Sequence, residues 1–413
     1  MSLSINHGPW LTHPRIGGIT IGFSSTEHCA AAVEYRTGGE PWQKNFQSEG
    51  GQIVRAETRH IFHLDGLIPE AEYEYRAIVF DPDIREEHVS AGKFTVFGPD
   101  RESYSFLVMA DLQFAPEKRL ELMKKYYSLG EAETCDFVVC LGDMLNRIDD
   151  FEHDALGGII DLLDRAGFLA KPILLVRGNH ELRGKAAWEW DRWFASPEGN
   201  SYSAFRQGAA AFLVLDSWSD QPSSNPGFQL DLDREFLDGE KEFLRRTVAE
   251  KLFLSAKYRI VMAHGASHSH IDQFRFLNPN MRHLTDEFFM GKNPRVPIHA
   301  WICGHIHHYI RTVPGKAECA SISSPPQPVT TPEKYAFPVL TTDGPDVMRE
   351  IVPPSGIQTS VFLVQVNESE LDIRAISEER GEIDRIAISA DREITEKMPI
   401  EHYVWKSESE AKA

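Results

Sequence analysis

The sequence predicts a mixed α/β domain preceded by a small all-β sandwich. With 413 residues, the chain is long for a single domain. Its first part carries short alternating strand patterns separated by turns, whereas from Tyr104 onward apolar strand-like runs alternate with segments of helical periodicity. We therefore expect one domain over residues 1–99, a second over residues 100–392, and a polar tail over residues 393–413.

The predicted N-terminal sandwich depends on short strands in which every second residue is apolar. Gly-Gly, Pro and Asp turns separate these strands, as is typical of antiparallel sandwiches. The segment Leu67–Arg76 contains the pattern Leu-x-Pro…Tyr-x-Tyr and resembles part of the fibronectin type III-like domains. The turn-rich stretch Phe97–Arg101 marks the predicted boundary. The expected strands are Gly17–Ser24, Ala31–Tyr35, His60–Leu64 and Tyr73–Phe80.

The predicted second domain alternates strands and helices, which indicates a largely parallel sheet packed with helices. Strands are expected at Phe106–Ala110, Phe137–Leu141, Ile173–Val176, Ala211–Leu215, Arg259–Ala263 and His299–Cys303, and later at Val361–Val366, Leu371–Ile376 and Ile383–Ile388. Helices are expected at Pro116–Gly130, Phe151–Gly167, Trp188–Trp193 and Gly239–Leu254. The Pro-rich stretch Ser323–Gly356 has little periodicity and is predicted to be a long loop.

Charge and composition limit the function classes that fit this chain. The formal net charge of −19 argues against non-specific binding to DNA or RNA, which depends on clustered Lys and Arg side chains. No apolar run approaches the roughly 18 residues that cross a bilayer. The five cysteines are scattered without a Cys-x-x-Cys pair, and the N-terminus shows no signal-peptide pattern. We therefore expect a reduced, cytoplasmic location; the oligomeric state stays open.

Several polar side chains follow directly after apolar runs and have the character of metal ligands. Oxygen and nitrogen donors at strand ends can hold two divalent cations side by side, as hydrolytic chemistry requires. Each motif alone is weak evidence, because Gly-Asp is usually a turn and Asn-His is often a helix cap. Together they predict a metal site. The candidates are Asp111 and Gln113 (Ala-Asp-Leu-Gln), Asp143 (Gly-Asp), Asn179 and His180 (Gly-Asn-His-Glu), His264, and His305 and His307 (Gly-His-Ile-His).

These motifs, in this order, resemble the calcineurin-like metallophosphoesterase superfamily over about Tyr104–Ile388. The resemblance implies a four-layer αββα sandwich, and the fibronectin-like segment in front is similar to the arrangement in purple acid phosphatases. It also implies a first metal bound by Asp111, Gln113 and His307, a second bound by Asn179, His264 and His305, and Asp143 as the bridge between them. His180 would stand beside the substrate without binding metal.

Two positions depart from the pattern of the family. Gln113 stands where most members have His. Two interpretations stay open: its neutral amide oxygen binds the first metal and shifts that site away from nitrogen-loving metals, or the side chain does not contact the metal directly. Of the four candidate ions Mn, Fe, Mg and Zn, we therefore favour Mn or Fe. Asn146 stands where purple acid phosphatases carry the Tyr that colours their ferric iron, which argues against a purple acid phosphatase proper.

The expected function is hydrolysis of a small-molecule phosphate ester by a hydroxide shared between two divalent metals. Asp143 and His180 are the predicted catalytic residues, with His180 protonating the leaving group and Glu181 orienting it. His268, His270 and Arg183 are weaker candidates for substrate binding. Two alternatives stand beside this reading. One is a phosphodiesterase acting on nucleotide or lipid-derived diesters, and the other is an inactive phosphoesterase fold that serves as a binding module.

Overall fold

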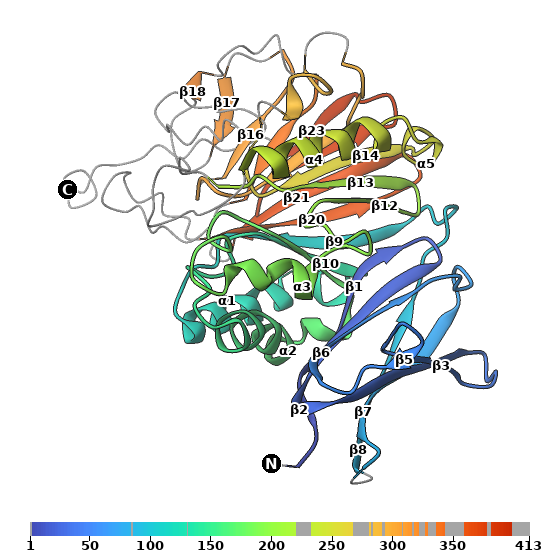
Figure 1. Cartoon of the computed structure of the whole chain (residues 1–413). Coiled ribbons are helices and arrows are strands. Elements are labelled where there is room, and N and C mark those ends of the chain that lie inside the picture. The colour runs from blue at the N-terminus through green and yellow to red at the C-terminus, as the bar shows by residue number, and fades with distance from the viewer. Residues whose placement is uncertain are drawn as a thin grey trace.

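A computed structural model describes residues 2–83, 86–129, 131–219, 233–266, 281, 284–290, 294–307, 309–315, 318–321, 327–328, 336–342, 359–377 and 381–398. An all-β N-terminal region lies at the bottom of the view in Figure 1, below a larger part built from two stacked sheets and their helices.

The N-terminal region consists of antiparallel strands arranged around one long central strand. Its strands are β1 (Ile5–Arg15), β2 (Gly18–Thr37), β3 (Gln43–Phe46), β4 (Ser48–Glu49), β5 (Gln52–Ile53), β6 (Glu57–Leu64), β7 (Glu72–Asp81) and β8 (Glu86–Thr95). The first half of β2 pairs with β1 and β6, and its second half pairs with β3 and β7. The two strands predicted at Gly17–Ser24 and Ala31–Tyr35 are therefore parts of one strand. The polar residues between them hid the connection, which runs through an irregularity after Ser24.

The first sheet of the larger part contains the first three strands predicted for it. Its strands are β9 (Tyr104–Met109), β10 (Phe137–Leu141), β11 (Ile173–Val176), β20 (Ser360–Val366), β21 (Glu370–Ser377), β22 (Gly381–Ser389) and β23 (Ile394–Met398). They lie in the order β11-β10-β9-β20-β21-β22-β23. The three strands β9, β10 and β11 are parallel, whereas β20 to β23 are antiparallel.

The second sheet is also mixed. Its strands are β12 (Ser203–Gln207), β13 (Ala210–Leu215), β14 (Tyr258–Ala263), β15 (Ala300–Cys303), β16 (Ile310–Thr312), β17 (Glu318–Ser321), β18 (Gln327–Pro328) and β19 (Val339–Thr341). They lie in the order β12-β13-β14-β15-β19-β16-β17-β18, and the run from β13 to β19 is parallel. The single largely parallel sheet that the alternating pattern indicates is thus two mixed sheets.

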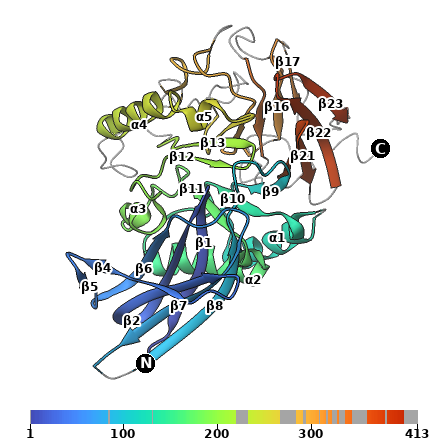
Figure 2. The ribbon, with the colours of Figure 1, turned by 90° about the vertical axis from the view of Figure 1, so that its right-hand side faces the viewer.

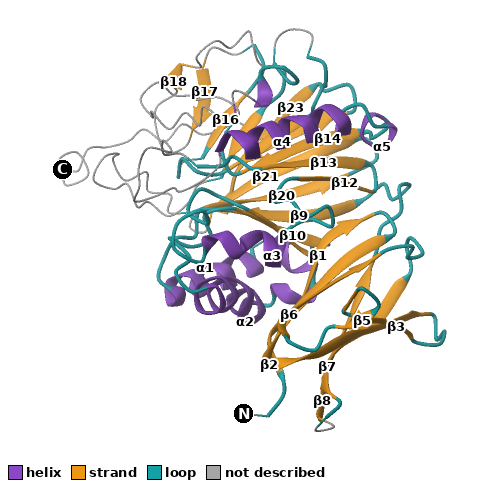
Figure 3. Ribbon diagram, viewed as in Figure 1, coloured by secondary structure: helices purple, strands orange, loops and turns teal. Residues whose placement is uncertain are grey.

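Helices cover the outer face of each sheet. The α-helices are α1 (Pro116–Ser128), α2 (Asp161–Ala166), α3 (Trp190–Phe194), α4 (Asp233–Thr247) and α5 (Lys251–Leu254); short 3₁₀ turns are η1 (Ala132–Thr134), η3 (Phe168–Ala170) and η4 (Ala187–Glu189), and η2 (Phe151–Ile160) is a π-helix. Figure 3 shows α1 to α3 on one side of the stacked strands and α4 and α5 on the other. This order of helix, sheet, sheet and helix confirms the four-layer fold.

The central strands of both sheets are buried on both faces. Along β10, Val138 and Cys140 pack against the helices, whereas Phe137 and Val139 pack against the second sheet. A strand covered on both faces needs apolar residues at every position, not at alternate ones. This is why Phe137–Leu141 and Ile173–Val176 were predicted to the residue from continuous apolar runs.

The N-terminal region packs directly on the larger part through β1, which Figure 2 shows reaching up to the strands above it. Trp10 of β1 is fully buried, with ring centroids 6.3 Å from Trp193 and 5.9 Å from Phe194. Of the tryptophan-rich segment, Trp190 and Trp193 are therefore core residues, while Trp188 is exposed. Aromatic side chains of this size contribute most of the packing energy at such a junction.

Three predicted elements differ from the structure. The segment Ile394–Met398, assigned to the polar tail, forms β23 and pairs with β22, because an edge strand can be mostly polar. Within the predicted loop Ser323–Gly356, the short strand β19 pairs with β15 and β16; most of the remaining stretch lies outside the described residues. The first ten residues of the helix expected at Phe151–Gly167 are π-helical.

In the part of the chain that the structure describes, no helix is both long and apolar enough to cross a membrane. Cys29, Cys135, Cys140 and Cys303 are free and buried. Buried thiols of this kind behave as small apolar side chains. The reduced, cytoplasmic location stays a prediction.

Three buried histidines make the fold sensitive to acid. Burial lowers the pKa of His13, His60 and His299 to about 4 each, because a protonated ring loses its hydration inside the protein. In the unfolded chain a histidine titrates near pH 6.5, so the unfolded state binds more protons between pH 6.5 and 4. The contribution of these groups to stability is complete above pH 6.5 and is lost as the pH falls toward 4.

We expect acidification from pH 7 to pH 5 to lower the free energy of unfolding by about 2 kcal/mol for each of these histidines. Urea unfolding in the presence of a chelator measures this loss without a contribution from metal. His60→Gln should reduce the pH dependence by about one such increment, since Gln47 and Ser25 can still bond an amide at this position. His28→Gln, at an exposed position, serves as the control. An unchanged pH dependence in His60→Gln would contradict the assignment.

Candidate metal centre

The predicted ligands converge from the carboxyl ends of five strands in two different sheets. In the first sheet, Asp111, Asp143 and Asn179 follow β9, β10 and β11. In the second sheet, His264 follows β14, and His305 and His307 follow β15. Neither sheet alone supplies a complete set. The centre therefore exists only because the two sheets are stacked with these edges facing each other.

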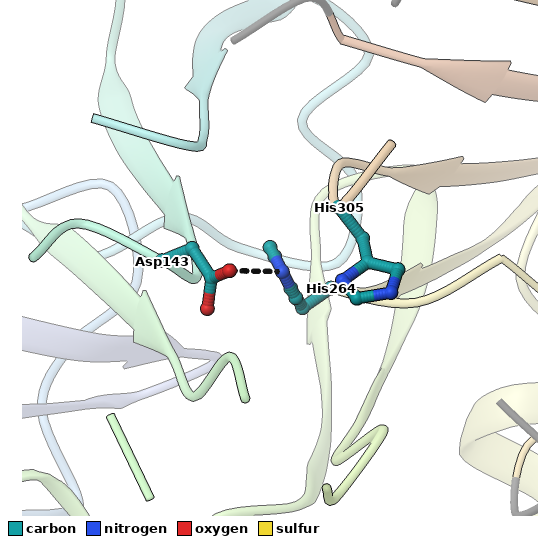
Figure 4. Close-up of side chains that lie close together, drawn as sticks. All are labelled: Asp143, His264 and His305. Atoms are coloured by element: carbon teal, nitrogen blue, oxygen red, sulfur yellow. Dashed lines mark ion pairs between the residues drawn. The ribbon is translucent and has the colours of Figure 1, made fainter. Parts of the chain in front are cut away.

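One group of side chains brings its candidate ligand atoms close together. The ligand atoms of Asp143, His264 and His305 all lie within 4.8 Å of one another (Figure 4). Nε2 of His264 is 3.0 Å from Oδ2 of Asp143, and Nδ1 of His305 is 3.0 Å from Oδ1 of Asn179. These four side chains correspond to the second metal position of the sequence-based prediction.

The first position lies beside this group. Nε2 of His307 is 3.4 Å from Oδ1 of Asp111, and the same oxygen is 3.8 Å from Nε2 of His264. Both oxygens of Asp111 accept the backbone N–H of His305. Gln113 presents its amide to Asp143, with Nε2 2.6 Å from Oδ2.

The donor set fits divalent cations. Two donor atoms bound to one ion at about 2.1 Å lie about 3.0–3.4 Å apart, the range of the three closest ligand pairs here. Nε2 of His264 is buried and, among the described residues, has no hydrogen bond of good geometry although it touches Asp143. When a ring nitrogen lies this close to a carboxylate oxygen but the angle is poor for a hydrogen bond, the pair is better placed to bind one ion together than to bond directly.

The buried charges depend on one another. Burial by itself lowers the pKa of His264. The negative charges of Asp143 and Asp111 outweigh this effect and raise the pKa to about 10. Burial likewise opposes ionisation of Asp143, yet the attraction of His264 leaves the pKa of this carboxyl below its usual value. At Asp111, burial dominates and raises the pKa. Without metal, His264 thus carries a proton between two carboxylates, and a divalent ion would take the place of that proton.

The backbone of these loops is strained where the ligands are attached. Asp111, Asp143, His305 and His307 all have positive φ, between 52° and 76°. Non-glycine residues rarely adopt this conformation, and such outliers cluster at functional sites. A Cβ on Gly178 would overlap the carboxylate of Asp143, so glycine is required for this close approach.

The sequence of this part of the chain matches a known family. Residues 104–309 match the sequence profile described as calcineurin-like phosphoesterase. Over this stretch the chain belongs to that family. It is a metal-dependent phosphoester hydrolase.

Two solved structures share the fold over most of the chain. Purple acid phosphatase PPD1 from yellow lupin (Lupinus luteus) seeds matches with a TM-score of 0.61 at 14% identity, over 92% of this chain and 74% of that one. PhoD matches with a TM-score of 0.59 at 12% identity, over 96% and 92%. At these identities the likeness establishes the fold. A search of curated proteins finds no match.

Glu181 of the phosphoesterase holds two ligand loops together. It is fully buried, and its carboxylate accepts the backbone N–H groups of Asp143, Met144 and Gly178, each at 2.8 Å. Burial and the charge of Asp143 raise its pKa to about 7. The sequence offered two interpretations of Glu181, as the residue that orients His180 or as an acid in the first turn of a helix. No helix begins here, and the hydrogen bonds of this carboxylate go to the backbone of the loops instead.

His180 lies at the edge of the centre. Its Nδ1 is 2.9 Å from the carbonyl oxygen of Asn146, and its Nε2 is 3.7 Å from Oδ2 of Asp143. Nη1 of Arg183 lies 2.8 Å from the same Nε2. Burial lowers the pKa of His180. Arg183 is thus close to the metal ligands, whereas His268 and His270 lie outside the described residues.

Two buried arginines near the centre hold parts of the fold together. Arg119 donates to the carbonyl oxygens of Leu112 and Phe114, which flank Gln113, and to that of Gly158 in the π-helix. Arg177, which directly follows β11, pairs with buried Asp216 at 2.7 Å. An Arg inside a predicted helix gives no sequence signal of such a role. The fact that Arg177 directly precedes Gly-Asn-His-Glu was a signal, but it was ambiguous.

Proposed function

We propose that this phosphoesterase hydrolyses phosphate monoesters with two divalent cations held between its sheets. The observation that carries the proposal is the convergence of carboxylate, amide and imidazole donors around Asp143, which comes from the first sheet and faces histidines of the second. Six side chains would hold the ions: Asp111, Asp143, Asn179, His264, His305 and His307. Bound there, the cations would generate a nucleophile from water at neutral pH and offset the charge of the phosphoryl oxygens.

The surrounding side chains have distinct tasks in this proposal. Asp143 is the shared ligand in this proposal, because its Oδ2 is 3.0 Å from Nε2 of His264, and this nitrogen is 3.8 Å from Asp111 of the first position. In its doubly protonated form, His180 gives the proton on Nε2 to the leaving oxygen and keeps the proton on Nδ1, which the carbonyl oxygen of Asn146 accepts in a hydrogen bond. Arg183, beside the same nitrogen, contacts the phosphoryl oxygens.

Arg183 is the observation that favours a monoester over a diester. A terminal phosphate of a monoester carries two negative charges, and a guanidinium next to the metal ligands supplies an extra cation for it. A diester carries one charge and needs room for two substituents instead. The alternative of a nucleotide or lipid-derived diester predicts that replacing Arg183 has little effect on turnover.

An inactive binding module would not require the complete donor set. The convergence of all six donors, on backbone that is strained at four of them, supports an active hydrolase. The carboxylate and amide oxygens among these six donors favour Mn or Fe over Zn for these sites. Four buried free thiols support a reducing compartment.

A substrate panel tests the proposed function. Purified enzyme loaded with Mn²⁺ should hydrolyse phosphomonoesters faster than matched diesters, and Arg183→Gln should reduce the difference. Faster hydrolysis of the diesters by the wild type would establish the diesterase alternative. The absence of both bound metal and hydrolysis of an aryl phosphate would establish the binding module.

His180→Ala should slow the hydrolysis of alkyl phosphates by about 10²–10⁴-fold, because alkoxides leave poorly without a proton. Nitrophenyl phosphates, whose phenolates leave unaided, should lose much less, and metal content should not change. His153→Ala, at a side chain 85% exposed, is the matched control. An equal loss for every leaving group would mean that His180 positions the phosphate without protonating the leaving group.

A further inference from the structure

We infer that Gln113 holds the carboxylate of Asp143 by a hydrogen bond and does not bind metal, so that the first metal position binds its ion much more weakly than the second. The inference rests on the proposed two-metal function and adds to it. The phosphoesterase would keep one ion permanently and acquire the other from the surrounding solution. Its activity would then follow the concentration of free divalent cation.

Gln113 is held in place by one hydrogen bond to its backbone and one from its side chain. It is 5% exposed, and its backbone carbonyl accepts a hydrogen bond from Nδ2 of Asn146 at 3.0 Å. Its amide nitrogen lies 2.6 Å from Oδ2 of Asp143. Since an ionised carboxylate only accepts hydrogen bonds, the group that faces it is the N–H of the amide and not the amide oxygen that a metal needs.

This hydrogen bond occupies the oxygen that both ions have to share. Oδ1 of Asp143 already accepts the backbone N–H of His180 at 2.8 Å. Oδ2 is therefore the oxygen directed at the ions, and Gln113 and His264 approach it at 2.6 and 3.0 Å. An ion at the first position competes with the amide N–H for this oxygen, whereas an ion at the second position only replaces the contact with His264.

The two positions also differ in the number of protein donors. Asp143 with Asn179, His264 and His305 gives the second position four donors, three of which already lie within 4.8 Å of one another. The first position has Asp143, Asp111 and His307. Asp111 adds a charge of its own, but both of its oxygens accept the N–H of His305. Fewer and partly occupied donors give the weaker site.

Titration with Mn²⁺ alone tests this inference on the full chain after removal of metal by a chelator. The free Mn²⁺ signal in electron paramagnetic resonance gives the number of bound ions and their dissociation constants. Wild type should show two classes of site whose dissociation constants differ by at least about tenfold, in the range that interactions around metal ligands produce. Gln113→His, which offers an imidazole nitrogen, should tighten the weaker class by about tenfold or more.

Gln113→Leu distinguishes a ligand from a hydrogen-bond donor. It removes both the amide oxygen and the N–H, and if Gln113 only holds Asp143, the variant still binds two ions, with the weaker class unchanged or tighter. Gln43→Leu, an exposed glutamine of β3, is the matched control. Loss of one bound ion in Gln113→Leu, or two equal dissociation constants in the wild type, would overturn the inference. A wild type that binds no Mn²⁺ at all would overturn the proposed function itself, which is a separate outcome.

Discussion

Replacing Asp143 with asparagine is expected to abolish the binding of both metals together and to lower phosphatase activity by about 10³-fold or more. In the proposed centre both metals share this carboxylate, and it is 1% exposed. Metal ions contribute several kcal/mol of transition-state stabilisation, and each 1.36 kcal/mol corresponds to a factor of ten in rate. Asparagine keeps the size of the side chain but removes its charge.

Elemental analysis of the purified variant and its turnover of an aryl phosphate measure the two effects. Asp164→Asn in α2 removes one exposed carboxylate and should leave both quantities unchanged. The variant should stay folded, because the N–H groups of Asp143 and His180 keep oxygen acceptors in Glu181 and in the amide. If the variant lost only one of two ions, Asp143 would be a ligand of a single position and not a bridge.

The charge of Asp143 also determines how the centre responds when metal is removed. His264, fully buried between Asp143 and Asp111, has its pKa raised to about 10 against the effect of burial. Asp143→Asn removes the larger of the two carboxylate contributions to this pKa, so the metal-free variant would hold His264 less firmly in its charged form. Asp143 therefore stabilises the charged form of His264 in the metal-free protein, in addition to its proposed role at the metals.

The parts of the fold that were predicted well are those in which the burial of a strand alone determines its local sequence pattern. Phe137–Leu141 and Ile173–Val176 are buried on both faces, so an unbroken apolar run identifies them. The segment Ile394–Met398 is an edge strand with mostly exposed side chains, and its pairing depends on β22, far outside any local pattern. Strand β19 has only three residues inside a Pro-rich stretch, where it is held by neighbours on both sides.

In the candidate site, too, features with a local sequence pattern could be predicted and features that depend on distant residues could not. Its candidate ligands could be named from the sequence because they are polar residues that follow apolar strands, and the structure places Asp143, His264 and His305 close together and His307 beside Asp111. The residues that hold those ligands could not be named, because their partners are backbone groups of distant loops. Glu181 contacts Asp143 and Met144 across 38 and 37 positions of the chain, and Arg119 contacts Gly158 across 39. Nothing in the local sequence marks an acid or an arginine for such a role.

Replacing Glu181 with glutamine is expected to lower the free energy of unfolding by about 3 kcal/mol, since hydrogen bonds to a charged group contribute about 1.5–3 kcal/mol each. One oxygen of the carboxylate accepts the N–H groups of Asp143 and Gly178, and the other accepts that of Met144. Glutamine retains one oxygen, and its amide N–H₂ then opposes a backbone N–H. The loops after β10 and β11 would separate, and metal affinity should fall by about 10–100-fold.

Glu240→Gln is the matched control, because this carboxyl is equally buried but accepts a single backbone N–H, from Asp216. Burial raises the pKa of Glu240 well above its usual value, and glutamine at this position keeps the size of the side chain and one oxygen to accept this N–H. Both variants are compared with wild type by urea unfolding and Mn²⁺ titration at pH 8, above the pKa of about 7 of Glu181, so that the carboxylate is ionised in the wild type. Equal losses in the two variants would show that burial alone, and not the bonds to the ligand loops, accounts for the effect. A loss of stability without a loss of metal affinity would show that the loops hold their ligands without Glu181.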